Sequence, residues 1–213
     1  MRLLALIPIA AAAGAETIDR IAVALGNRVI TQGAVVEQVR VAGFLNRTPL
    51  ALDPASMRRM AERMIEQQLL RREMESSRFP TPSEDEAKPM IEKIKRDQYP
   101  SEADYRAELA KYGIGEEALV RNLVAQLVTL RFVELRFRPS NTVTEGEIEI
   151  YYRDTYTPRW EKTRPNSEVP VIEDARDEIE QILLQEKIDQ AMSEWLKAAR
   201  GSARVRYFDE AFR

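Results

Sequence analysis

The sequence of 213 residues contains no histidine and no cysteine. This excludes Ser-His-Asp and Cys-His nucleophilic pairs, histidine acid–base catalysis, and metal sites built on imidazole or thiolate ligands. Disulfides are excluded as well, so cysteine usage says nothing about the redox compartment. Any catalysis would have to rest on carboxylate, lysine or tyrosine side chains, and we expect no metal site.

The sequence also lacks an apolar run of membrane-spanning length. The longest such run, residues 3–13, follows Arg2 and ends in Ala13-Gly14-Ala15. It is too short to cross a bilayer, which takes about 20 residues, but it has the length and small-residue end of a signal peptide. We therefore expect residues 1–15 to be a cleaved signal peptide of an exported, soluble protein. The alternative is a buried N-terminal segment.

There is no excess of basic residues and no glycine-rich phosphate loop. The chain has 32 Lys and Arg against 35 Asp and Glu, a formal net charge of −3. This balance argues against a nucleic-acid partner, and the missing loop argues against a nucleotide cofactor. We expect no cofactor at all. The arginines between residues 58 and 72 alternate with glutamates and indicate a solvated helix face.

Helical periodicity dominates what is present. The opening is different: in residues 18–31 apolar residues alternate and flank Gly26-Asn27, which predicts a β-hairpin. Residues 157–170 carry three prolines and no periodicity and indicate a linker. Helices are predicted over about 31–46, 53–77, 83–99, 101–112, 116–138, 144–156 and 171–200. The predicted caps and breaks are Thr31, Asp53 with Pro54, the Ser83–Glu86 and Thr144–Glu147 capping boxes, a kink or late start at Pro89, Ser101, Gly113, Pro139 and Gly201.

A last alternating segment, residues 203–208, predicts a strand. A hairpin of two strands is marginal by itself in water, so we expect this strand to complete a sheet with the opening hairpin. The predicted fold is therefore mainly α, with a small β-sheet formed by an N-terminal hairpin and the C-terminal strand.

Four segments carry a resemblance to a known family. They are DRIAVALGNRVITQGAV from Asp19, RMIEQQLLRREMESSRFPTPSEDE from Arg63, YRAELAKYGIGEEALVRNLVAQLVTLRFVELRFRPSNTVTEGEIEIYY from Tyr105, and ARDEIEQILLQEKIDQAMSEWLKAARGSARVRYFD from Ala175. In helix lengths, caps and apolar positions they resemble the SurA family of periplasmic chaperones. Family members usually carry parvulin-type prolyl isomerase domains between these blocks, but here only residues 157–174 intervene.

The resemblance implies a multi-helix chaperone core without the isomerase. Its expected parts are a SurA N-terminal-like helical domain over 16–156, a linker over 157–170 in place of the parvulin domain, and a helix and strand over 171–213. It also implies a non-enzymatic periplasmic protein that holds unfolded exported or outer-membrane proteins without ATP, in an apolar crevice between the helical body and the final helix.

Several apolar residues are candidates for contact with such clients, and core packing is the alternative for each. They are Met57, Met60 and Met64 on one helix face, Phe132 and Phe137 late in another helix, and Tyr151, Tyr152, Tyr156 and Trp160 before the linker. Glu145, Glu147 and Glu149 are too far apart around a helix to act as a catalytic pair, so capping and solvation explain them better.

Two other functions stay open. The first is a dedicated interaction module whose groove is filled either by one specific partner or by a second copy of the chain in a homodimer, for which exchange of the C-terminal helix is a plausible route. The second, a distant third overall, is a peptidyl-prolyl isomerase.

Overall fold

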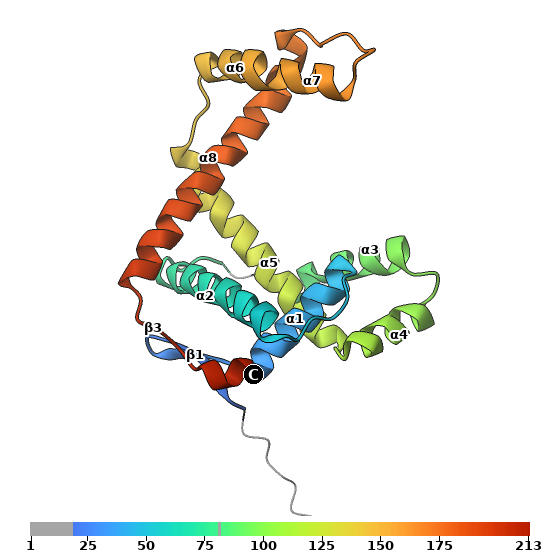
Figure 1. Ribbon diagram of the computed structural model, residues 1–213, viewed down its shortest axis with the longest axis vertical. Helices are drawn as coiled ribbons and strands as arrows, with labels where there is room; N and C mark the ends of the chain where they lie inside the picture. The colour runs from blue at the N-terminus through green and yellow to red at the C-terminus, as the bar shows by residue number, and fades with distance from the viewer. Residues whose placement is uncertain (1–18, 81) are drawn as a thin grey trace, which may run out of the picture.

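The computed structural model describes residues 19–80 and 82–213, so the predicted signal peptide lies outside the described residues. It is mainly helical with one small sheet (Figure 1). The strands are β1 (Ile21–Leu25), β2 (Arg28–Thr31) and β3 (Val205–Tyr207). The α-helices are α1 (Gln32–Asn46), α2 (Pro54–Ser76), α3 (Lys88–Gln98), α4 (Glu102–Tyr112), α5 (Glu116–Phe137), α6 (Glu145–Tyr151), α7 (Thr157–Thr163) and α8 (Ile172–Ser202). Short turns of helix are η1 (Glu84–Glu86), η2 (Arg138–Ser140), η3 (Tyr152–Tyr156) and η4 (Asp209–Phe212).

The sheet joins the two ends of the described chain. Its strand order is β2-β1-β3, with both pairings antiparallel, so the C-terminal strand completes the opening hairpin as predicted. Gly26 makes the hairpin turn with a φ of 61°, a conformation that glycine adopts without strain. A register shift between Ile21 and Val23 breaks the alternation of β1, so Ile21 is 43% exposed while Ala22 and Val23 are fully buried.

Most predicted helix ends are confirmed because they depend on local chemistry. Thr31 Oγ1 accepts from the Ala34 N–H, Asp53 caps α2 with Pro54 in its first turn, and Ser101 caps α4. The Ser83–Glu86 and Thr144–Glu147 capping boxes both form. Helix α3 starts late, with Pro89 in its first turn, and Gly113 ends α4 in the left-handed conformation.

Two predicted breaks are wrong. Residues 157–163, predicted as linker, form α7, which continues without a break from α6 through the π-helical turn η3, so Pro158 does not end the helix. Gly201 does not stop α8, which continues to Ser202.

Three hydrophobic clusters hold together the sheet, helices α1 to α5 and the C-terminal part of α8. The first joins the sheet to α1, α2, η4 and the end of α8; the second joins α1, α3, α4 and α5; the third joins α2, α5 and α8. A fourth, smaller cluster around Ile148, Ala175 and Ile179 packs α6 and η3 on the first turns of α8. Figure 1 shows the result: α8 runs from the body at its C-terminal end to an outer lobe of α6 and α7 at the other. We call these parts the body and the outer lobe.

Within the described residues, no helix combines the length and the apolar character needed to cross a bilayer.

Candidate functional site

Helix α2 carries a mainly polar stripe of exposed and half-buried residues. Its members recur every three or four residues and so share one face: Ser56, Met60, Arg63, Gln67, Arg71 and Glu75. Three neighbouring depressions follow this stripe. The first two share Gln67 in their lining and the second and third share Arg63, so the three depressions follow one another along α2. We call them together the α2 groove; its walls are α1 and α5.

The end of the α2 groove nearest the C-terminus of α2 contains apolar residues together with polar and charged ones, among them Arg71, Glu84 and Thr129; we call it the apolar section. This apolar section has a volume of ≈ 420 Å³, which lies within the range of small-ligand pockets. Met74 and Val128 are each 8% exposed and belong to the core, so this section has a firm floor. Its remaining apolar lining is Phe79, Val124 and Ala125. The section has room for a large side chain of a bound partner.

The middle of the groove, the amide section, is lined by side-chain amides. Gln126 Nε2 donates to Asn122 Oδ1 over 2.7 Å, and Asn122 Nδ2 donates to Gln38 Oε1 over 2.8 Å. Asn122 is only 9% exposed, so it anchors this chain of amides from below. An amide group both donates and accepts, as does a peptide backbone. Amides at the surface of this section therefore match the main chain of an extended polypeptide whatever its side chains.

Arginines dominate the charge of the groove. Arg59 donates to Ser56 Oγ over 2.9 Å, and Arg121 pairs with Glu37 over 3.1 Å. Within residues 19–80 and 82–213, Arg63 and Arg71 form no ion pair. The centre of the groove is thus positive on a chain whose net charge is negative.

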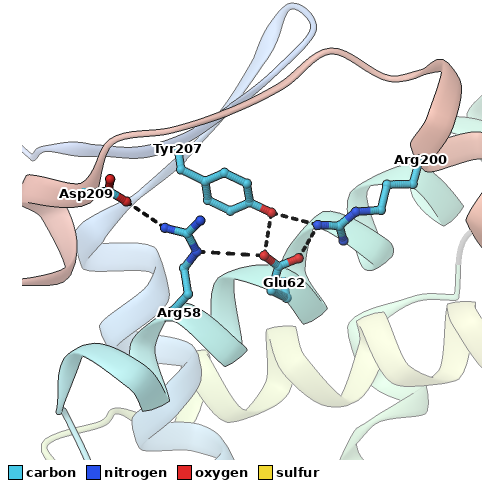
Figure 2. A network of polar contacts seen from close by, with 5 residues as sticks. All are labelled: Arg58, Glu62, Arg200, Tyr207 and Asp209. Carbon is cyan, nitrogen blue, oxygen red and sulfur yellow. Dashed lines mark hydrogen bonds and ion pairs between the residues drawn. The ribbon is translucent and has the colours of Figure 1, made fainter.

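The opposite face of α2 holds the C-terminal segment in place. Figure 2 shows Glu62 of α2 between Tyr207 of β3 and Arg200 of α8. Tyr207 Oη donates to Glu62 Oε1 over 2.5 Å, and the Arg200 guanidinium donates both to Glu62 and to Tyr207 Oη. Arg58 lies 3.7 Å above the Tyr207 ring and pairs with Asp209 over 2.8 Å. We call these five residues the latch.

The latch keeps Glu62 ionised. Burial by itself would raise the pKa of this carboxyl group, but hydrogen bonds from Tyr207 and Arg200 and the charges of Arg200 and Arg58 outweigh it. The net result is that the pKa of Glu62 lies below its usual value. Burial, followed by the hydrogen bond to Glu62 and the charge of Glu62, raises the pKa of Tyr207 against the opposing charges of Arg200 and Arg58.

The latch accounts for one of the arginines that the sequence assigned to a solvated face. Arg58 belongs to the latch, Arg59, Arg63 and Arg71 follow the α2 groove, and Arg72 lines a cleft toward α8.

The three methionines proposed for client contact lie in different surroundings. Met57 is 4% exposed and belongs to the core under the sheet. Met64 is half-buried against the same core. Met60 is half-buried and lines the α2 groove. Only Met60 of the three thus lies in the groove.

The two candidate phenylalanines of α5 are core residues. Phe132 and Phe137 are 2% and 5% exposed. They pack edge-to-face on one another, with ring centroids 6.5 Å apart, and also contact Phe79 and Trp195. They join α5 to α8 instead of facing a client.

The aromatic candidates before the predicted linker stack on one another in the outer lobe. The rings of Tyr152, Tyr156 and Trp160 lie at successive centroid distances of 5.8 Å, and Arg164 covers the free face of Trp160 at 4.0 Å. Tyr152 Oη donates to the carbonyl of Pro170 over 2.7 Å. All of these rings, and that of Tyr151, are half-buried. The stack therefore fastens residues 164–170 to the outer lobe.

The crevice expected between the body and α8 has a counterpart in two clefts that flank the α2–α8 contact. One, of ≈ 620 Å³, has Trp195 and Ala198 in its wall; the other, of ≈ 510 Å³, has Met192 and Leu196. Charged residues from both helices also line them, including Arg72, Glu73, Glu66 and Lys197. The apolar section of the α2 groove lies on the other side of α2.

Sequence reasoning missed the α2 groove. The signal was present in the spacing of Met60, Arg63, Gln67 and Arg71, but amides and arginines at helical spacing are typical of any solvated face. Only the approach of α1 and α5 turns this face into a groove.

The chain has no match among protein-family models or curated proteins.

Proposed function

We propose that this protein is an ATP-independent periplasmic chaperone that holds unfolded exported or outer-membrane proteins, and that the α2 groove is where it holds them. The observation that carries the proposal is the adjacency of two depressions along α2: an apolar section of ≈ 420 Å³ lies next to an amide section, with Gln67 in the lining of both. The resemblance to the SurA family in the segments from Asp19, Arg63, Tyr105 and Ala175 supports the same function.

The two sections divide the work of binding an unfolded chain. The amide section bonds to the main chain, which all polypeptides share. The apolar section accepts a large side chain, at about 25 cal/mol for each Å² of apolar surface that leaves water. Burying one such side chain contributes roughly 1.5–3 kcal/mol, so each groove contact stays weak. Weak contacts allow release without an energy source, as an ATP-independent holdase requires.

Filling the apolar section tests the proposal. Ala125 is half-buried in its wall, so Ala125→Phe places a ring in the space meant for a client side chain. The matched control is Ala198→Phe, which puts the same ring into the α2–α8 cleft.

The assay is light scattering during dilution of several unrelated outer-membrane proteins from denaturant. We expect the wild-type protein and Ala198→Phe to suppress aggregation at near-stoichiometric ratios and Ala125→Phe to lose this activity while its circular dichroism spectrum is unchanged. If Ala198→Phe is the variant that loses activity, clients bind between α2 and α8 instead. If the wild-type protein suppresses none of them and pull-down recovers one tight partner, the chain is a dedicated interaction module.

A further inference from the structure

We infer that the α2 groove selects extended segments in which a large apolar side chain lies a few residues from carboxylates. This inference rests on the proposed function and names the class of segment that the groove prefers. Three observations carry it: the arginines of the groove, the position of its apolar section, and the separation of these arginines from the apolar section along α2.

The charge of the groove favours an anionic occupant. Arg63 and Arg71 project from the stripe of α2 that faces the groove and form no ion pair with the residues the structure describes. Two glutamates also line the apolar section: Glu75 pairs with Arg28, and Glu84 is exposed to solvent, where its charge is screened. A carboxylate of a bound segment would complete the pairing of both arginines, whereas a lysine there would be repelled.

The geometry of α2 sets the spacing. Met74 marks the apolar section; Arg71 lies three residues and Arg63 eleven residues before it along the helix. At 1.5 Å per helical residue these separations are about 4.5 Å and about 16 Å. An extended segment advances about 3.3 Å per residue, so it covers them in about one to two and about five residues. A carboxylate one to two residues from the apolar side chain of the segment therefore reaches Arg71, and a carboxylate about five residues away reaches Arg63.

The test uses fluorescein-labelled peptides of one design. A central Phe is flanked on both sides by Asp at the second and fifth positions, which makes chain direction irrelevant, and the other positions are Gly, Ser and Thr. The counterparts carry Asn or Lys in place of Asp. We measure binding by fluorescence anisotropy to the full chain at low and at high salt.

We expect the Asp peptide to bind about fivefold more tightly than the Asn peptide, which corresponds to two partly exposed ion pairs, and the Lys peptide to bind most weakly. This preference fades at 1 M salt, where the screening length falls to about 3 Å. The double variant Arg63→Glu/Arg71→Glu should reverse the order of the peptides. The control Arg72→Glu changes an exposed arginine of the same helix on the α8 side and should preserve it.

The outcomes separate this inference from the proposed function. Equal binding of the three peptides, or equal effects of Arg72→Glu and the double variant, overturns the charge preference even where aggregation of neutral clients is still suppressed. Loss of binding to anionic lipid vesicles in the double variant, without any change in peptide binding, overturns it in favour of a lipid surface. If no peptide binds and no client is protected, the proposed function fails as well.

Discussion

Removing the carboxylate of the latch should loosen the C-terminal segment from the body. Glu62 accepts hydrogen bonds from Tyr207 and Arg200, and Glu62→Ala leaves both donors without this acceptor. Hydrogen bonds to charged groups contribute about 1.5–3 kcal/mol each when desolvated, whereas exposed ion pairs contribute about 0–1 kcal/mol. The side chains of Glu62 and Arg200 are 34% and 38% exposed, so the low end applies. We expect a total loss of about 2 kcal/mol.

Thermal and guanidinium denaturation followed by circular dichroism measure this loss. For a chain of this size, about 1 kcal/mol lowers Tm by about 2–4 °C, so Glu62→Ala should lower Tm by about 4–8 °C. Glu66→Ala is the matched control, since Glu66 lies one turn along the same helix on an exposed position. It should stay within about 0.5 kcal/mol of wild type. If Glu62→Ala does so too, the latch contributes nothing and the reasoning is refuted.

The latch also predicts how the stability of the folded protein changes with pH. The pKa of Glu62 is lower in the folded protein than in the unfolded chain, where it is about 4.3. The folded state thus gains stability from this group above that pH and loses it as the pH falls toward the folded value. The difference in stability between wild type and Glu62→Ala should therefore narrow below about pH 4.

Three further predictions concern the outer lobe, the core and two glycines. A hydrogen bond from Lys187 of α8, followed by the cap contacts with Thr144, lowers the pKa of Glu147 to about 2. Glu147→Gln should therefore be less stable than wild type at neutral pH, and this difference should vanish as the pH falls from about 4.3 to about 2. Urea denaturation at a series of pH values measures it. Phe137→Ala should cost about 3–5 kcal/mol and shift the fluorescence of Trp195 to the red, because the two rings are in contact; an unchanged spectrum would contradict this packing. Gly113→Ala should destabilise by about 1 kcal/mol, since its φ is 65°, whereas Gly201→Ala, in open space within a helix, should stabilise slightly in the same melts.

The sequence was a good guide where structure is decided locally or by simple elimination. Thr31, Asp53 and Ser101 cap helices because their side chains bond to the next turn, whatever the rest of the chain does. The pairing of β3 with β1 is a long-range contact, yet it followed from the instability of a lone hairpin.

The failures occurred where the outcome depends on packing. Proline content indicated a linker over 157–170, but the stack of Tyr152, Tyr156 and Trp160 supports a helix up to Thr163. The exposure of Ile21 follows from a bulge that periodicity does not reveal.

The candidate site was the least predictable part. Phe132 and Phe137 have the composition of a binding surface but are buried, because α8 covers them. Gln67 and Arg71 have the composition of a solvated face but line a groove, because α5 lies beside them. Composition cannot distinguish these cases, since both depend on which helices meet.

Site-specific crosslinking to a bound client tests the central claim most directly. A photoreactive benzoyl-phenylalanine replaces one residue at a time at four positions. Two of them, Gln67 and Thr129, lie in the α2 groove, and the other two, Arg72 and Ala198, lie in the α2–α8 cleft. With an unfolded outer-membrane protein as client, we expect crosslinks from Gln67 and Thr129 and few from the other two positions. Crosslinks from Arg72 and Ala198 alone would show that clients bind on the opposite face of α2 and would contradict the account.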